Sequence, residues 1–440
     1  MITLNDDLKF ILNRFASSGY EAFLVGGCVR DALMGLTPHD YDITTNARPD
    51  QVHSLFNDCR IIDTGIKHGT VTLLLNGEPY EITTYRRETE YDDHRHPNSV
   101  TYSDSLYEDL VRRDFTINAF AYNPEKGLID YFNGIDDLDN KVLRCVGDPE
   151  ERFDEDALRI LRALRFASRF HLAIESRTEA ALFSRKDLLK YISVERITSE
   201  FNEIICSDDA AEYLDKYREI IAVFLPEIEI MFDYDQHSKY HNYDLWHHTL
   251  KVLEEVPPQL TLRWAALLHD IGKPEVRSVG KDGHWHYINH RSASATITES
   301  ILKRLHFDNK NIKRIVSLVR YHDNKTSQDI DIKMLLSKTD LDFFRELIIL
   351  QRADNLAHYS EYVHDPSYYS QITKKAEEFS ASALHINDLR VNGDDLIQIG
   401  ITGPAIGKCL ERALKMVLDG KLENSKEELL KYIRTLKKAD

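Results

Sequence analysis

The spacing of hydrophobic residues changes along this chain from mixed helix and strand periods to a helical period alone. Residues 5–17 place apolar side chains at helical intervals behind Asn5, which predicts a capped amphipathic helix. The run from Phe23 to Val25 stops at two glycines and predicts a short strand before a turn. Residues 71–86 are rich in β-forming residues around Asn76-Gly77, which predicts a β-hairpin.

From residue 147 onward the hydrophobic pattern is helical. Pro149 and several acidic residues mark the start of a long helix, and the helical pattern continues to about Phe170. We therefore predict an α+β fold, in which a small mixed-sheet head precedes an all-helical neck, body and tail. The expected boundaries are 1–146 for the head, 147–236 for the neck, 237–365 for the body and 366–440 for the tail.

The composition of the chain favours a soluble protein of several domains over a membrane or secreted protein. The chain has 440 residues, of which 42% are hydrophobic and 29% charged, so we expect a soluble protein of about two to four domains. It has no apolar run of about 18 residues and no N-terminal signal-peptide pattern, so we expect neither a membrane span nor secretion. The cysteines are odd in number and far apart, which predicts no disulfide framework and a cytoplasmic location.

The net charge of -17 argues against a general nucleic-acid-binding protein. The charge is uneven, however, because residues 403–440 hold nine Lys or Arg and six Asp or Glu, a net charge of +3. Helices of this tail are plausible contacts for RNA phosphates, and a solvated helical tail is an equally good interpretation. The sequence does not specify an oligomeric state.

A glycine turn follows the first predicted strand. Gly26 and Gly27 let the backbone approach a bulky anionic group with their N–H groups directed at it. The next residues, Val29 to Met34, predict a helix whose N-terminus faces the same place and attracts phosphate. Arg30 adds a positive charge there. The segment therefore predicts a phosphate cradle.

Two carboxylates follow the cradle. Asp40 and Asp42 are two residues apart, so in a strand they point the same way. Paired carboxylates beside a triphosphate supply the oxygen ligands that Mg²⁺ prefers, which indicates metal-assisted phosphoryl or nucleotidyl transfer. The second strand of the predicted hairpin belongs to the same sheet, which makes Glu81 a candidate third carboxylate. A solvent-facing Glu81 is an equally good interpretation.

Together, Gly-Gly-x-Val-Arg-Asp and the downstream Asp-x-Asp resemble the catalytic signature of the DNA polymerase beta nucleotidyltransferase superfamily. The string is similar to its class II tRNA nucleotidyltransferase and bacterial poly(A) polymerase branch. A second string, Arg-Arg-Asp-Phe-Thr-x-Asn-Ala, matches that branch and predicts a helix start. The resemblance implies two Mg²⁺ ions on Asp40 and Asp42. It also implies nucleotide binding by Gly26, Gly27, Arg30, Asp31, Arg113, Asp114 and Asn118.

A third string predicts how the base is selected. We expect Asp156 and Arg159 one turn apart on one helix face, a carboxylate acceptor beside a guanidinium donor. Such a pair accepts cytosine and adenine, and it rejects uracil and guanine, whose donor and acceptor order is reversed. Glu155-Asp156-x-x-Arg159 resembles the nucleotide-selecting motif of the family. Arg162 continues a basic stripe along the same helix.

The body carries a second set of candidate ligands. Their order, a His, then His-Asp, then a distant Asp, resembles the HD phosphohydrolase superfamily. Imidazole and carboxylate ligands suit a divalent transition metal, which can activate water for phosphoester hydrolysis. The predicted ligands are His248, His269, Asp270 and Asp354. His290 and His322 are expected to complete either a two-metal site or a phosphate pocket, and His247 is expected to be a bystander.

The resemblance as a whole implies a template-independent enzyme that adds CCA to the tRNA 3′ end from CTP and ATP and releases pyrophosphate. The HD module is expected to act on phosphorylated 3′ ends. An A-adding enzyme and a poly(A) polymerase remain alternatives. A string beginning at Asp93, Asp-His-Arg-His-Pro, resembles the flexible loop of CCA-adding enzymes and speaks against a CC-only enzyme. The alternative from another class is an HD phosphohydrolase with a non-catalytic, RNA-binding head.

Overall fold

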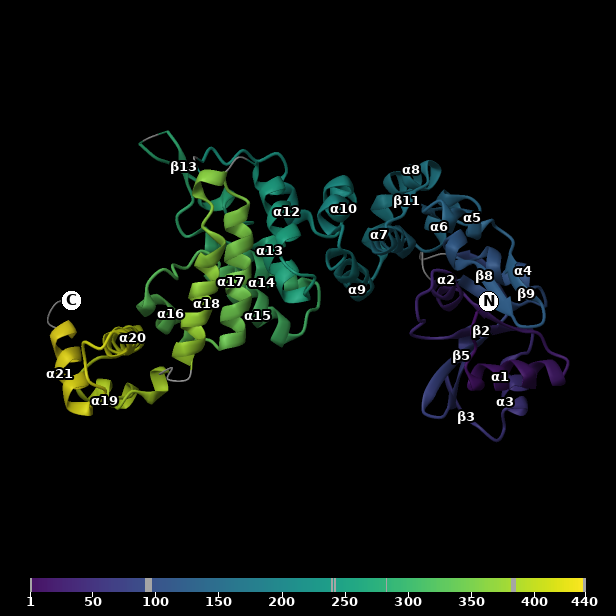
Figure 1. Ribbon diagram of the computed structural model, residues 1–440, viewed down its shortest axis with the longest axis horizontal. Helices are drawn as coiled ribbons and strands as arrows, with labels where there is room; N and C mark the ends of the chain where they lie inside the picture. Colours follow the sequence, from purple (N-terminus) through teal and green to yellow (C-terminus); the bar gives the residue numbers. More distant parts are fainter. Residues whose placement is uncertain are drawn as a thin grey trace. The chain divides into compact units, whose positions relative to one another are not determined.

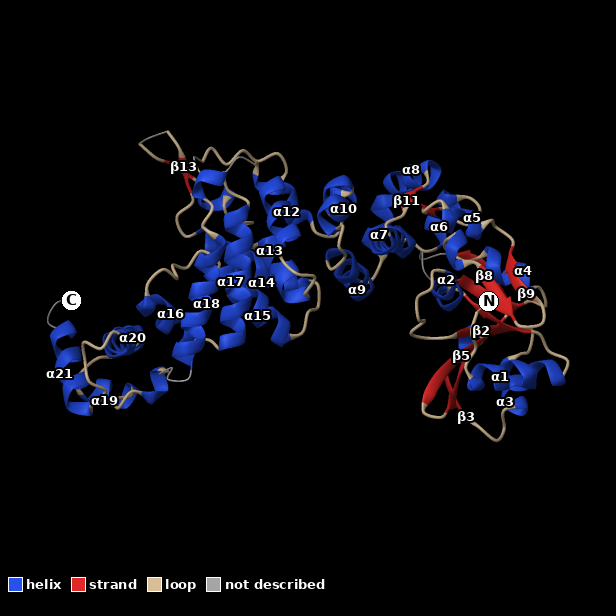
Figure 2. Cartoon of the chain, in the orientation of Figure 1, coloured by secondary structure: helices blue, strands red, loops and turns tan. Residues whose placement is uncertain are grey.

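The computed structural model describes residues 2–91, 97–238, 240, 243–281, 283–380 and 385–437. The chain divides into two compact units, Met1–Pro226 and Glu227–Asp440. The main β-sheet belongs to the first unit, and the second unit is almost entirely helical (Figures 1 and 2). The predicted α+β fold with a mixed-sheet head is therefore confirmed.

A seven-stranded mixed sheet organises the first unit, with the strand order β3-β4-β5-β2-β1-β8-β9. Strands β2 and β5 are parallel, and the other neighbouring strands are antiparallel. The turn between β4 and β5 has positive φ at Asn76 and Gly77, which confirms the predicted hairpin. The strands are β1 (Ala22–Val25), β2 (Asp42–Thr45), β3 (Arg60–Gly65), β4 (Thr70–Leu75), β5 (Glu78–Thr84), β8 (Phe120–Asn123) and β9 (Gly127–Asp130).

Short helices accompany this sheet. The first begins as predicted, because the side chain of Asn5 accepts a hydrogen bond of 2.8 Å from the Leu8 amide. Another helix, α4, buries Leu106 and Leu110 against Phe23 of β1. The elements are α1 (Asp6–Ser17), α2 (Gly27–Leu33), α3 (Pro49–Leu55), α4 (Leu106–Val111) and α5 (Gly134–Asp139), with 3₁₀ turns η1 (Ile66–His68) and η2 (Thr116–Asn118). The Arg-Arg-Asp string therefore follows α4, and the helix that it was predicted to start is only the 3₁₀ turn η2, which begins two residues after Asp114.

Two paired strands flank the string that resembles the flexible loop of CCA-adding enzymes. Strands β6 (Arg86–Tyr91) and β7 (Pro97–Tyr102) pair antiparallel with each other. Thr, Tyr and Val recur in this segment, and these residue types favour extended backbone. Of the string that begins at Asp93, residues 93–96 lie outside the described residues, so its role stays a prediction.

The helical part of the first unit begins with a break. Asp156 has extended backbone, with φ −141° and ψ 100°, so the expected long helix is two helices. The Asp156 side chain accepts a 3.1 Å hydrogen bond from the Leu158 amide, which competes with helical continuation. The elements are β10 (Val142–Leu143), α6 (Pro149–Glu155), α7 (Leu158–Phe170), β11 (Ala173–Ile174), α8 (Ser176–Arg185), η3 (Lys186–Tyr191), α9 (Val194–Ile205), α10 (Ala210–Lys216) and α11 (Arg218–Ile221). The 3₁₀ turn η4 (Pro226–Met231) begins at the last residue of this unit and continues into the second.

In the second unit, α12, α13, α14, α15 and α17 pack together, and α18 packs on α16 and α17. A separate apolar cluster, which includes Leu396, Leu414 and Ile433, holds the tail helices together. The helices are α12 (Leu245–Glu255), α13 (Leu260–Leu268), α14 (His290–Arg304), α15 (Asn309–Tyr321), α16 (Asp329–Leu336), α17 (Leu341–Leu356), α18 (Pro366–Ser380), α19 (Gly393–Gln398), α20 (Pro404–Leu418) and α21 (Lys426–Lys437). The remaining elements are η5 (Pro274–Val276), β12 (Ser278–Val279), β13 (Trp285–His286), η6 (Ser360–Tyr362) and η7 (Ile386–Asp388).

None of the helices in the described part of the chain combines the length and apolar composition that a bilayer span requires.

Candidate functional site

The acidic residues of the head gather at the start of β2. Asp42 is the first residue of that strand and lies directly opposite Glu81 in the parallel strand β5. Asp40 lies in the bend before the strand, so the prediction that both aspartates lie in one strand is wrong. Asp40 and Glu81 are exposed, and both are close enough to act electrostatically on Asp42. The structure therefore brings the three predicted carboxylates together.

Among these three carboxylates, the pKa of Asp42 is raised by its surroundings. Burial raises the pKa of its carboxyl to about 6, Arg113 opposes that rise, and the charges of Asp40 and Glu81 add to it. A largely buried carboxylate beside two further acids is poorly compensated by a single guanidinium. A divalent cation bound by these oxygens would relieve the repulsion, so the residues present fit the predicted metal.

The glycine turn brings Arg113 over the start of α2. Gly26 has φ +72°, a conformation that L side chains rarely adopt. A Cβ atom on Gly26 would lie 2.7 Å from Nη1 of Arg113, so a side chain at this position would displace the guanidinium. The same Nη1 donates a long hydrogen bond of 3.5 Å to the backbone carbonyl of Asn118. The turn therefore fixes Arg113 between the predicted phosphate cradle and Asp42.

Substituting Gly26 with alanine is expected to displace Arg113 and lower the rate of nucleotide incorporation by about 100-fold. Gly127→Ala is the matched control, because Gly127 also has positive φ (+76°) but a Cβ there meets nothing within 4 Å. Both variants carry backbone strain, and only Gly26→Ala disturbs the guanidinium. Single-turnover incorporation rates and melting temperatures of the two variants separate these effects. Equal rates in the two variants would contradict this role of Gly26.

Arg30 has a structural environment that the sequence did not indicate. Its side chain is buried and donates to Asn118 Oδ1 at 2.6 Å and to Asp31 Oδ1 at 2.6 and 2.9 Å. Its guanidinium also lies over the rings of Phe166 and Phe170, at 5.1 and 4.6 Å. In this structure Arg30 therefore joins α2 to α7, and its predicted contact with phosphate stays a prediction.

Asp114 makes a second connection between the head and α7. Arg162 donates two hydrogen bonds of 2.6 and 2.8 Å to its carboxylate, and the Asn118 amide donates a third at 3.0 Å. Burial alone would raise the pKa of Asp114, but Arg162 and Asn118 outweigh it and hold the pKa at about 2. Asp114 thus remains charged and orients Arg162 and Asn118.

The predicted base-selecting pair is not a pair in this structure. Asp156 lies at the break after α6, where Arg196 of α9 binds its carboxylate at 2.8 Å. Arg159 is buried, bonds to Glu155 at 2.5 Å and donates to the backbone carbonyl of Arg112 at 2.8 Å. The prediction that Asp156 and Arg159 share a helix face is wrong, because the helix breaks between them.

Arg196 is a residue near this site to which the sequence assigned no role. It lies in a Glu-Arg-Ile-Thr-Ser-Glu string, and the final acid of that string, Glu200, forms a 3.1 Å ion pair with Arg165. The distance along the sequence between Arg196 and Asp156 does not indicate that they pair, because α9 packs against α7 only in the folded protein. The expected basic stripe of α7 therefore faces acids within the protein at several positions.

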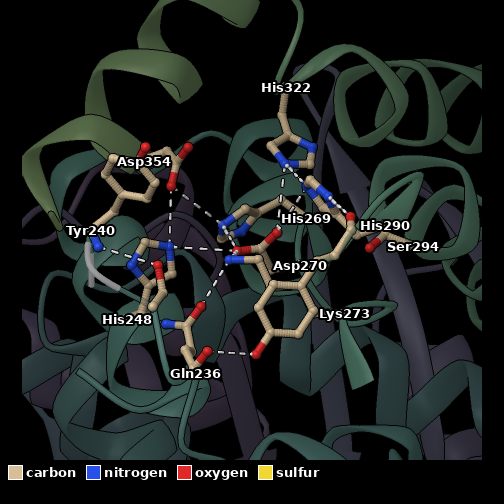
Figure 3. A network of polar contacts seen from close by, with 12 residues as sticks. Gln236, Tyr240, His248, His269, Asp270, Lys273, His290, Ser294, His322 and Asp354 are labelled. Atoms are coloured by element: carbon tan, nitrogen blue, oxygen red, sulfur yellow. Dashed lines mark hydrogen bonds and ion pairs between the residues drawn. The ribbon is translucent and has the colours of Figure 1, made fainter. Parts of the chain in front are cut away.

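The second unit brings its first four predicted ligands together (Figure 3). His248 comes from α12, His269 and Asp270 follow α13, and Asp354 lies in α17. His248 Nε2 is 3.1 Å from Asp354 Oδ1 and 3.6 Å from Asp270 Oδ2. His269 Nε2 is 3.2 Å from Asp270 Oδ2 and 3.8 Å from Asp354 Oδ1. Tetrahedral ligands of one zinc-sized ion are about 3.4 Å apart, so this spacing fits a metal site.

The remaining two histidines meet the other oxygen of Asp270. His290 Nε2 and His322 Nε2 are 3.5 and 3.6 Å from Asp270 Oδ1, and 3.2 Å from each other. The Nδ1 atoms of these rings face the backbone carbonyls of Tyr287 and Val319 at 2.9 and 2.6 Å. A carbonyl accepts only from N–H, so these contacts place a ring proton on Nδ1, and in the neutral ring the lone pair is then on Nε2. Asp270 therefore lies between two pairs of histidine Nε2 atoms that could bind metal, those of His248 and His269 and those of His290 and His322.

Buried polar groups hold Asp270 in place. Lys273 Nζ is 2.6 Å from Asp270 Oδ2 and donates at 2.8 Å to Gln236. Burial would raise the pKa of Asp270, but Lys273 and His269 keep it well below its usual range. By contrast, His247 is exposed and bonds to Asp244 at 2.7 Å, away from this cluster.

A cavity of about 920 Å³ opens beside the cluster. It exposes Asp270, His290, His322 and Asp354, so a molecule in the cavity can reach both predicted ligand groups. The cavity is far larger than a phosphate ion requires. Its lining combines cationic and aromatic side chains, among them Lys273, Arg291, Lys325, Trp285 and Tyr287.

Comparisons with known proteins agree with the geometry of the head. The Poly A polymerase head domain matches residues 22–144. The probable RNA and SrmB-binding site of polymerase A matches residues 171–231, and a putative domain 2 of tRNA nucleotidyltransferase matches 284–433. These matches follow one another along most of the chain.

Full-length relatives extend this result. The chain is 34% identical to a CCA-adding enzyme of Lactobacillus helveticus, with 97% of this chain and 96% of the relative covered. It is 35% identical to a CCA-adding enzyme of Limosilactobacillus fermentum, over 98% and 96% of the two chains. The crystal structure of the Bacillus stearothermophilus CCA-adding enzyme in complex with CTP matches with a TM-score of 0.70 and 27% identity, covering 99% of this chain and 100% of that one. CCA-adding enzymes are nucleotidyltransferases that use divalent metals, and the acidic and histidine groups described above are candidate ligands. The chain belongs to the CCA-adding enzyme family.

Proposed function

We propose that this protein adds C, C and A to the 3′ end of tRNA from CTP and ATP and releases pyrophosphate. The observation that carries the proposal is Asp42, a largely buried acid flanked by Asp40, Glu81 and Arg113 in a chain of this family. Asp40 and Asp42 would hold two Mg²⁺ ions, which when bound lower the pKa of the attacking hydroxyl and neutralise charge at the phosphates. Gly26, Gly27 and Arg113 would receive the triphosphate.

The base would be read at the break between α6 and α7. Asp156 and Arg159 remain the proposed readers, with Glu155 fixing Arg159 and Arg196 holding the Asp156 carboxylate before a nucleotide binds. A tRNA transcript that ends in its first added C should accept CTP, whereas a transcript that ends in CC should accept ATP. UTP and GTP should be rejected by about 100-fold or more, because wrong bases leave buried polar groups unpaired. Equal use of all four nucleotides would overturn this assignment.

Because the Asp42 carboxylate is partly buried beside two other acids, its charge should also affect the stability of the protein. The pKa of Asp42 is about 6 when folded, above the ordinary aspartate value of about 4, so the folded protein binds this proton more tightly. The protonated Asp42 carboxyl therefore contributes to the free energy of unfolding fully below about pH 4, and this contribution is lost as the pH rises through about 6. In EDTA, Asp42→Asn should therefore stabilise the protein by about 2 kcal/mol at pH 8 and by less at pH 5.

Thermal unfolding at pH 5 and pH 8 measures this difference. Mg²⁺ should raise the melting temperature of the original protein at pH 8 and have a smaller effect on Asp42→Asn. The same stabilisation at both pH values would show that the charge of Asp42 is not its source.

The second unit would carry a metal-dependent phosphohydrolase site. His248, His269, Asp270 and Asp354 would hold one divalent transition-metal ion, and Asp270, His290 and His322 a second, which when bound would activate water for attack on a phosphoester. The orientation of the His290 and His322 rings favours a second metal over a phosphate pocket, because in the neutral rings Nε2 carries the lone pair that a metal binds. Phosphorylated RNA 3′ ends are the proposed substrates.

Metal content tests the two-ion assignment. In an Asp40→Ala/Asp42→Ala background, which removes the proposed ligands of the head, protein dialysed against Mn²⁺ or Ni²⁺ should retain about two ions per chain, and the further substitution His322→Ala should leave about one. Retention of one ion by both proteins would instead favour a phosphate pocket at His290 and His322.

A further inference from the structure

Asp109 is a fully buried carboxylate in α4, beside the proposed active site but outside every motif discussed above. Arg112 donates two hydrogen bonds of 2.7 and 3.1 Å to its Oδ1. Thr44 Oγ1 donates a third, of 3.0 Å, to Oδ2, and Arg113 Nη2 is 3.9 Å from the same oxygen. A buried charge is costly unless it is paired in this way, so the arrangement holds all four side chains together.

The contact with Thr44 locates Asp109 relative to the proposed metal site. Thr44 and Asp42 are two residues apart in β2, so their side chains point to the same face of the sheet. In β1, Phe23 lies opposite Thr44 and Val25 lies opposite Asp42. Both apolar residues belong to the cluster that α4 covers. Asp109 therefore contacts β2 on the face that also carries Asp42, two residues along the strand from it.

The two arginines extend from Asp109 in different directions. Arg113 lies over the Gly26 turn and opposes the rise in the pKa of Asp42. The backbone carbonyl of Arg112 accepts the 2.8 Å hydrogen bond from Arg159, a proposed reader of the base. The segment that Asp109 anchors thus touches both the reacting end and the base-reading end of the nucleotide site.

We propose that Asp109 is a positioning residue that fixes the Arg112–Arg113 segment against β2. It sets the place of Arg113 beside Asp42 and, through the Arg112 carbonyl, the place of Arg159. This inference rests on the proposed function of the head. Losing the anchor should therefore change both the rate of incorporation and the choice of base, while a buried carboxylate elsewhere in the head should affect only stability.

Asp109→Asn is the primary test, because it keeps the shape and removes the charge. Asp137→Asn is the matched control, since Asp137 is also buried and also accepts from a threonine and an arginine, Thr116 and Arg144. For CTP addition to tRNA, Asp109→Asn should lower kcat by about 100-fold and raise the relative use of UTP. Asp137→Asn should lower the melting temperature without changing either quantity.

A double-mutant cycle gives a readout that general destabilisation would not produce. If Asp109 acts through Arg113, then Arg113→Gln should lower kcat strongly, and adding Asp109→Asn should cost little more. Multiplicative losses in the double variant would overturn the proposal, as would an Asp109→Asn variant with the kinetics of Asp137→Asn. If Asp109→Asn does not fold, Thr44→Val serves as the test instead, because it removes the hydrogen bond from Thr44 to Asp109. The expected loss in kcat is about tenfold. Failure of the original protein to extend tRNA would contradict the proposed function instead.

Discussion

The double variant Asp40→Ala/Asp42→Ala is expected to lose nucleotide incorporation by a factor of about 1,000 or more. Both carboxylates are needed to hold the two ions, and β2 contains no acid besides Asp42. Asp42 is the more sensitive position, because it is partly buried near Arg113, whereas Asp40 is exposed. Asp42→Ala alone should therefore cost more than Asp40→Ala alone. Single-turnover addition of one C to a tRNA transcript measures all three losses.

Glu78→Ala serves as the control, because Glu78 is an exposed acid in β5, the strand that also carries Glu81. It should retain the original rate. Hydrolysis by the second unit should also be unchanged in Asp40→Ala/Asp42→Ala, since none of its proposed ligands is altered. Incorporation that survives the double substitution would show that the head is not the nucleotidyltransferase site.

The second large effect is expected in the other unit. His269→Ala removes a fully buried nitrogen that lies 3.2 Å from Asp270 and 3.8 Å from Asp354, so the first metal site loses a ligand. Hydrolysis of bis(p-nitrophenyl) phosphate in Mn²⁺ or Ni²⁺ should fall by about 1,000-fold. CCA addition should be unaffected, because this reaction is assigned to the head.

His247→Ala is the matched control for His269→Ala. His247 lies next to a predicted ligand in the sequence, but its side chain is exposed and bonds to Asp244. Its removal should leave hydrolysis within about twofold of the original rate. If both histidine variants hydrolyse the ester at the original rate, the cluster is not a phosphohydrolase site, even if it binds metal.

The sequence predicted those features that depend on neighbours along the chain. Helix α1 with its Asn5 cap, the hairpin at Asn76-Gly77 and the strand–glycine–helix arrangement around Gly26 follow from local spacing and turn chemistry. The order of His248, His269-Asp270 and Asp354 predicted their convergence, although they come from separate segments. In that case the resemblance to a known family supplied what spacing alone does not.

Features set by distant partners were not predictable in this way. Asp156 ends α6 because its side chain bonds to the Leu158 amide, and its carboxylate then meets Arg196, forty residues later. Arg30 was expected to face phosphate, but Phe166 and Phe170 of α7 lie against its guanidinium. Helix periodicity cannot reveal either partner, because each belongs to an element whose position is set by packing.

The importance of Asp109 also could not be predicted from the sequence. In the sequence it is one acid among several that precede the Arg-Arg-Asp string, and its neighbour Glu108 is of the same type. The structure distinguishes the two, because Asp109 is fully buried against Thr44 and Arg112, whereas Glu108 remains partly accessible and pairs with Arg87. Burial, which depends on the whole sheet, is what identifies Asp109 as a candidate positioning residue.

The most direct test of the central claim is stepwise extension of three tRNA transcripts, ending at the discriminator base, at C and at CC, each with one nucleotide and Mg²⁺. The account predicts two additions to the first transcript with CTP, one C on the second and one A on the third with ATP. Extension of the CC-ended transcript alone, by a single A, would make the protein an A-adding enzyme. Unlimited addition of A to any RNA would make it a poly(A) polymerase, and no extension of any transcript would contradict the account altogether.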